Sequence, residues 1–134
     1  MGLIVDTGVL IRLERDPAYI DFAAYEHYGE AYICAVTASE LLVGVHRANT
    51  EERRLKRSAF VENVLRDFPA LAFDLAAARV HAHLLASLAR NITLGAHDLI
   101  IGATAVVHGF PVLTTNPADF QRMPGCQVEV PRTA

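Results

Sequence analysis

Short runs of hydrophobic residues alternate along this chain with longer segments in which hydrophobic positions recur every three or four residues. Five runs are too short for a helix and predict buried strands, at residues 3–5, 31–35, 71–73, 112–114 and 128–130. The longer segments predict helices at residues 9–15, 17–28, 37–48, 50–68, 74–90, 95–108 and from 117 onward. This alternation indicates an α/β fold built on a mostly parallel sheet of about five short strands.

Polar residues stand at several of the predicted helix starts, where their side chains can cap free backbone amides. Three starts carry such residues: Asp6 or Thr7, Thr37 with Glu40 in the spacing of a capping box, and Asn116 with Asp119 on either side of Pro117. A good cap stabilises a helix by about 1 kcal/mol, and the helix dipole favours acids at this end. Each acidic residue, taken singly, is therefore explained by capping.

Four of the acidic residues also share a place in the predicted sheet. Asp6 follows the first strand, Glu40 and Asp119 come shortly after the second and fourth strands, and Asp98 lies in a first helical turn. In a parallel sheet these positions fall at one edge, so we expect the four carboxylates to converge. Like charges that converge repel unless a cation intervenes, and Mg²⁺ and Mn²⁺ prefer carboxylate oxygen. The grouping indicates metal-assisted phosphodiester hydrolysis, with capping alone as the alternative.

Composition narrows the class of protein. The 134 residues suit one domain, 52% are hydrophobic, and no apolar run approaches the length of a membrane helix. The net charge of −3 argues against a broadly cationic nucleic-acid binder. The one concentration of positive charge, Arg53, Arg54, Lys56 and Arg57, is either a solvated helix face or a contact for RNA phosphates. Cys34 and Cys126 lack CxxC spacing, which predicts reduced thiols and a cytoplasmic protein.

Other catalytic arrangements find little support. The chain has no HExxH, Walker A or GxGxxG motif and no nucleophile elbow around a serine. His97 precedes Asp98, and we expect it to be a surface residue. A phosphohydrolase with Asp6 as a covalent nucleophile would need a second acid two residues on, where Gly8 stands. A receiver domain would need a late lysine, whereas Lys56 is the only lysine.

Four motifs in order give the chain a wider resemblance. They are residues 3–11 (LIVDTGVLI), 37–45 (TASELLVGV), 94–103 (LGAHDLIIGA) and 113–120 (LTTNPADF), followed by Pro124 and Gly125. With these motifs at these separations, the chain resembles the PIN-domain family over nearly its whole length, and within it the VapC-type ribonuclease toxins of bacterial toxin–antitoxin pairs. The resemblance implies one PIN-like domain over residues 1–134, a three-layer α/β/α sandwich, and an RNA-cleaving site that holds Mg²⁺, with Mn²⁺ as a substitute.

Site residues follow from the resemblance position by position. Asp6, Glu40 and Asp98 are the expected core acids, which bind metal directly or through water. Relatives place the fourth acid either at the position of Asn116 or three residues later. We therefore assign Asp119 to that role, and Asn116 becomes a polar supporting or cap residue.

The resemblance carries further expectations about positioning residues and partners. Thr7 and Thr114 are expected to orient ligands by hydrogen bonds, and Thr115 stands where relatives often carry arginine. The resemblance also implies a homodimer and a complex with a cognate VapB-type antitoxin that blocks the site. The alternative is a catalytically inactive PIN-like module that binds RNA or protein.

Overall fold

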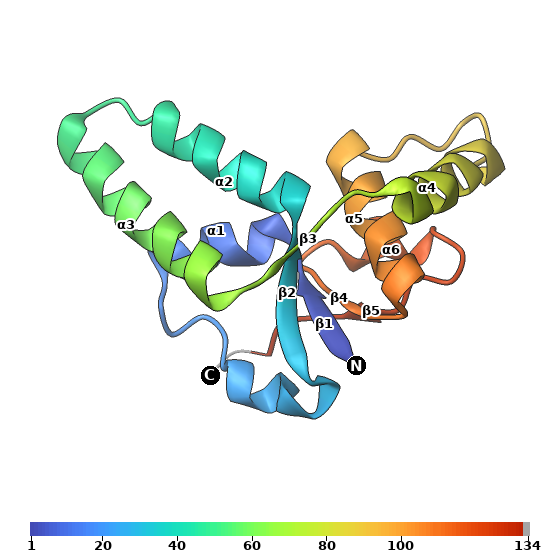
Figure 1. The fold of residues 1–134 in the computed structure, drawn as a ribbon, viewed down its shortest axis with the longest axis horizontal. Coiled ribbons are helices and arrows are strands. Elements are labelled where there is room, and N and C mark those ends of the chain that lie inside the picture. The colour runs from blue at the N-terminus through green and yellow to red at the C-terminus, as the bar shows by residue number, and fades with distance from the viewer. Residues whose placement is uncertain (133–134) are drawn as a thin grey trace.

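The central sheet has five strands that all run parallel, in the order β3-β2-β1-β4-β5 (Figure 1). The computed structural model describes residues 1–132, so the predicted domain over 1–134 includes two residues, 133 and 134, outside the described part. The strands are β1 (Gly2–Val5), β2 (Glu30–Cys34), β3 (Ala70–Leu71), β4 (Val112–Leu113) and β5 (Val128–Glu129). The predicted parallel α/β sheet of about five short strands is confirmed.

Within residues 1–132, six α-helices and one 3₁₀-helix connect the strands. They are α1 (Thr7–Arg15), the 3₁₀-helix η1 (Phe22–Tyr28), α2 (Ala35–His46), α3 (Glu51–Asp67), α4 (Leu75–Ser87), α5 (Ala96–His108) and α6 (Pro117–Gln121). In Figure 1 the paired α2 and α3 lie on one side of the strands, and α4 and α5 lie on the other. No helix within residues 1–132 is both long enough and apolar enough to cross a membrane.

Alternation along the strands produces two cores, one on each face of the sheet. In β1, Leu3 and Val5 join a core with side chains from α1, η1, α2 and α3. Ile4 turns to the opposite face and joins a second core with α4, α5 and α6. Successive side chains of a strand point to opposite faces, so a fully apolar strand must be covered on both. The three-layer sandwich is therefore confirmed.

The predicted helix over residues 17–28 is wrong in its first half. The carboxylate of Asp16 accepts a hydrogen bond from the amide of Ala18 at 3.2 Å, and the carboxylate of Asp21 accepts one from the amide of Ala23 at 3.0 Å. The bond to Asp16 competes with helical backbone bonds, and the bond to Asp21 caps the helix that begins at Phe22. Only η1, over Phe22–Tyr28, becomes helical, and its geometry is 3₁₀.

The predicted start of α2 at Thr37 is also wrong. The helix begins at Ala35, directly after β2, and its N-cap residue Cys34 makes no side-chain capping bond. Thr37 and Glu40 are therefore inside the helix and do not form a capping box. Thr37 is fully buried, so this threonine has a role in packing and not in capping the helix.

The strand order fixes where a ligand site can form. From β1 the chain proceeds to β2 and β3 on one side and then returns to β4 and β5 on the other, so the order reverses between β1 and β4. In open parallel sheets, ligands bind at the carboxyl ends of the strands beside such a reversal. Asp6 follows β1 and Thr114 follows β4, and these two residues therefore stand at the switch point.

Phe120 tests the packing that supports α6. Its side chain is fully buried in the second core. Replacing Phe120 by Ala removes a large buried ring, and we expect the free energy of unfolding to fall by about 3–5 kcal/mol in urea titrations. Leu55→Ala, at a side chain that is 63% exposed, is the control and should change stability by less than about 0.5 kcal/mol. Equal effects of the two substitutions would contradict this packing.

Candidate active site

Asp6 is a buried carboxylate at the junction of β1, β4 and α1. Its side chain is 6% exposed and serves as the N-cap of α1, where Oδ1 accepts a hydrogen bond from the amide of Thr7 at 2.9 Å. Oδ2 accepts a hydrogen bond from the hydroxyl of Thr114 at 2.7 Å. Burial raises the pKa of Asp6, the hydrogen bonds from Thr114 and Thr7 oppose that rise, and the charge of Glu40 adds to it.

Glu40, in the second turn of α2, is held by contacts from two other helices. The hydroxyl of Thr7 donates to its Oε1 at 2.9 Å, and the same hydroxyl oxygen lies 3.0 Å from Oγ1 of Thr37. Nδ1 of His97 lies 3.2 Å from Oε2 of Glu40. The pattern predicted as a capping box thus reflects a contact between α1 and α2. His97 is 55% exposed but is not merely a surface residue, since it reaches the acid.

Asp98 interacts electrostatically with the other three predicted acids. It lies in the first turn of α5. Burial, followed by the charges of Asp6, Asp119 and Glu40, raises its pKa to about 6, while His97 acts in the opposite direction. Charge effects of this kind fall off with distance, so three acids from three other parts of the chain must lie near Asp98.

Asp119 and Asn116 complete the edge of the cluster. The side-chain amide of Asn116 donates to Oδ2 of Asp119 at 2.8 Å, and the backbone amide of Asn116 donates to Oγ1 of Thr114 at 2.9 Å. Asn116 makes no side-chain capping bond to α6. A chain of hydrogen bonds therefore runs from Asp6 through Thr114 and Asn116 to Asp119.

The oxygen atoms that this cluster offers as metal ligands suit a hard divalent cation. All four acids offer carboxylate oxygen, which Mg²⁺ and Mn²⁺ prefer, and a cation would relieve the repulsion that raises the pKa of Asp98. Within residues 1–132, no three Asp, Glu, His or Cys side chains are arranged as a ready-made ligand set. The carboxylates are thus electrostatic neighbours, and both oxygens of Asp6 and Glu40 already have protein partners.

The predicted basic cluster lies on α3 and is engaged in local contacts. Arg54 pairs with Glu51 at 2.6 Å and Lys56 with Glu52 at 3.5 Å, and the guanidinium of Arg53 donates to Oδ1 of Asn49 at 2.8 Å. These contacts are exposed and contribute little stability.

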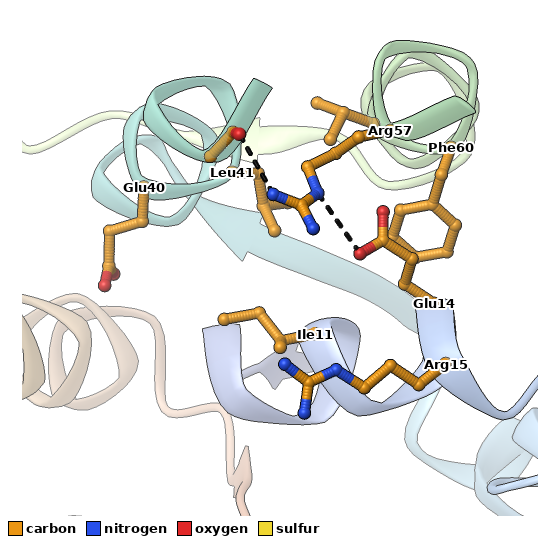
Figure 2. A pocket seen from close by; sticks show the side chains of 9 residues that line it. Ile11, Glu14, Arg15, Glu40, Leu41, Arg57 and Phe60 are labelled. Atoms are coloured by element: carbon orange, nitrogen blue, oxygen red, sulfur yellow. Dashed lines mark hydrogen bonds and ion pairs between the residues drawn. The ribbon is translucent and has the colours of Figure 1, made fainter. Parts of the chain in front are cut away.

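Arg57 has a different role from its neighbours in that cluster. Its guanidinium pairs with Glu14 at 3.5 Å and donates to the carbonyl oxygen of Gly44 at 3.1 Å, which ties α3 to α1 and α2 (Figure 2). Both interactions lie in a hollow of about 150 Å³ between these helices. Glu40 lines one end of the hollow, so this end of the hollow borders the acid cluster.

Comparisons with known proteins agree with this geometry. The family model "PIN domain" matches residues 3–125. The chain is 42% identical over 129 residues to Ribonuclease VapC1 of Rickettsia felis, covering 96% of this chain and 95% of that protein. It is 41% identical to Ribonuclease VapC of Rickettsia bellii over the same shares. A crystal structure of DNA-bound VapBC from Salmonella typhimurium superimposes with a TM-score of 0.81 at 27% identity, covering 97% of this chain and 98% of that one.

The raised pKa of Asp98 predicts that this residue makes the free energy of unfolding depend on pH. Its folded-state pKa, about 6, is above the ordinary value of 3.8. The folded protein therefore binds more protons than the unfolded chain between these values, and this contribution to stability falls as pH rises through the window. In metal-free protein at about pH 7.5, we expect Asp98→Asn to raise the free energy of unfolding by about 1 kcal/mol, after allowance for solvent screening of this half-buried group.

Urea titrations at about pH 7.5 and about pH 4 check this prediction, since the advantage of Asp98→Asn should disappear at the lower pH. Asp74→Asn, at the N-cap of α4, controls for the exchange itself. A loss of stability of the same size at both pH values in the Asp98 variant would contradict the proposed repulsion.

Proposed function

The chain belongs to the PIN-domain family, and we propose that it is a metal-dependent endoribonuclease toxin of the VapC kind, acting as one domain over residues 1–134. The proposal is supported by the charges of Asp6, Asp119 and Glu40 that act on Asp98, and by the hydrogen bonds of Asp6 with Thr114 and of Glu40 with Thr7 beside the switch point of a parallel sheet. The ribonuclease names of the relatives that are 42% and 41% identical support the same activity.

Each acid has a distinct support, which suggests distinct roles in holding the cation. Asp6 is held by a backbone amide and by Thr114, which fixes both of its carboxylate oxygens. Asp98 is repelled by the other three acids, and a bound cation would relieve that repulsion. Glu40, bonded to Thr7 and His97, is placed to act through water, and Asp119 is oriented by Asn116.

We assign Mg²⁺ to this site, with Mn²⁺ as a substitute. When bound, such an ion activates water for attack on phosphorus and stabilises charge on the phosphodiester oxygens. The protein's own contribution is to hold Asp6 and Glu40 by hydrogen bonds, so their carboxylates need little rearrangement to serve this chemistry.

Two partners follow from the proposal. An antitoxin of the VapB kind would close the site, because a guanidinium can bind a carboxylate cluster through paired hydrogen bonds. A homodimer would cover the apolar surface formed by Phe73, Leu75 and Leu85, which are 41%, 68% and 52% exposed beside and along α4. The toxin–antitoxin assembly would then be a hetero-oligomer. Free Cys34 and Cys126 fit a reducing cytoplasm.

RNA cleavage tests the activity directly. With Mg²⁺ or Mn²⁺ present, we expect Asp6→Asn and Asp98→Asn to lower the cleavage rate at least about 100-fold, because each removes charge worth several kcal/mol in the transition state. Asp119→Asn should have a smaller effect, of about 10-fold. Asp74→Asn exchanges an acid at a helix N-cap outside the cluster and should leave the rate within about twofold. Equal rates in all variants would refute the proposal.

Metal binding distinguishes the enzyme from an inactive PIN-like module. Calorimetric titration with Mn²⁺ should give a binding isotherm for the native chain that is abolished by Asp6→Asn and retained by Asp74→Asn. Carboxylate dependence is expected because a hard cation draws its affinity from charged oxygen ligands. A native chain, free of antitoxin, that binds no Mn²⁺ would favour the inactive module.

A further inference from the structure

Two hollows lie against the outer surface of α1, and the first of them is lined by Glu40 of the acid cluster. The first is the hollow between α1, α2 and α3 with Glu40 at one end. The second, of about 390 Å³, lies along α1 and is lined by Gly8, Ile11, Arg12, Arg15 and Asp16. A Cβ atom placed on Gly8 would lie 3.2 Å from Oγ1 of Thr115, so this hollow begins against the turn that follows Thr114.

Arg15 lines both hollows, and Ile11 does so as well. In Figure 2 the Arg15 side chain runs back along α1 toward Ile11, in the direction of the end where Glu40 lies. Helical side chains tilt toward the N-terminus of their helix, which directs this charge toward the acids. Among residues 1–132, neither Arg15 nor Arg12 forms a salt bridge.

Arg12 is held in place by an aromatic contact. Its guanidinium carbon lies 4.7 Å from the centroid of the Tyr19 ring. Stacking on a ring occupies the face of the guanidinium and leaves its N–H edge free to bind an anion. Because the group is already oriented, binding a phosphate would cost less conformational entropy than for a freely rotating arginine.

The positions of Arg12 and Arg15 along α1 fit an RNA strand that extends away from the acid cluster. Arg12 and Arg15 are six and nine residues beyond Asp6, which corresponds to roughly 9 Å and 13.5 Å along the helix axis. Both arginines lie on the wall of the same hollow. By contrast, Arg53, Arg54 and Lys56 on α3 contact neighbours on their own helix or at its start and line neither hollow.

We propose that Arg12 and Arg15 bind the phosphates of single-stranded RNA next to the cleavage position, and that Arg53, Arg54 and Lys56 on α3 do not. This assignment rests on the proposed function and specifies how its substrate is held. Cations in the last turn of α1 also favour the helix dipole. That effect, however, would not require two arginines free of carboxylate partners on the wall of one hollow that begins beside Gly8 and the turn at Thr115.

Salt-dependent RNA binding separates these roles. The chain carrying Asp98→Asn, which prevents cleavage, would be titrated with a labelled, unstructured RNA of mixed sequence at several salt concentrations. Adding Arg12→Gln and Arg15→Gln should lower the slope of log K against log[salt] by about 1.4, since each lost phosphate contact on a single strand contributes about 0.7. Arg66→Gln with Arg79→Gln, two exposed arginines on α3 and α4, removes the same charge and should leave the slope within about 0.3.

Three outcomes would overturn the inference. The first is an unchanged slope in the α1 pair, and the second is an equal decrease in the control pair or in Arg53→Gln with Arg54→Gln. The third is retained RNA binding with weakened antitoxin binding, which would assign this surface to a partner protein. If the native chain cleaves RNA while the α1 pair behaves normally, only this inference fails. If the native chain neither binds nor cleaves RNA, the proposed function fails with it.

Discussion

The buried hydrogen bond between Thr114 and Asp6 joins the fold to the site. It closes the gap between β1 and β4, where the strand order reverses, and it partly offsets the desolvation of a carboxylate that is 6% exposed. The parallel pairing of Val5 with Leu113 sets the register that brings the two residues together. A slip by one residue would turn Thr114 to the other face of the sheet. The sheet register thus determines the geometry of the proposed site.

The acid cluster works against stability in the absence of a cation. Burial and repulsion from Asp6, Asp119 and Glu40 raise the pKa of Asp98, so at pH values above that pKa the folded chain holds a negative charge that costs less in the unfolded chain. The two hydrophobic cores on either side of the sheet supply the opposing stabilisation. Local strain of this kind at a site, compensated by ordinary packing elsewhere, is typical of functional sites.

Sequence patterns predicted the sheet and the four acids because both depend on order along the chain. Apolar runs gave the strands, and parallel topology then placed the acids at one edge. Predictions were wrong where one local sequence pattern is compatible with two different arrangements of the side chains. Thr37 and Glu40 have capping-box spacing, yet the partner of Glu40 is Thr7 on another helix. The contact of His97 with Glu40 and the hollow beside Arg15 depend on helix packing, which no single segment encodes.

Helix α1 shows why stability alone cannot reveal these roles. Asp6 caps its N-terminus and Arg12 and Arg15 stand in its last turn, so each charge lies where the helix dipole favours it. Asp6 also acts electrostatically on Asp98, and Arg12 and Arg15 line the hollow along α1. Because capping and function make the same demand on residue type, substitution at either end weakens the helix as well as the proposed site. Only a measurement that counts phosphates or protons separates the two contributions, because a lost cap changes neither count.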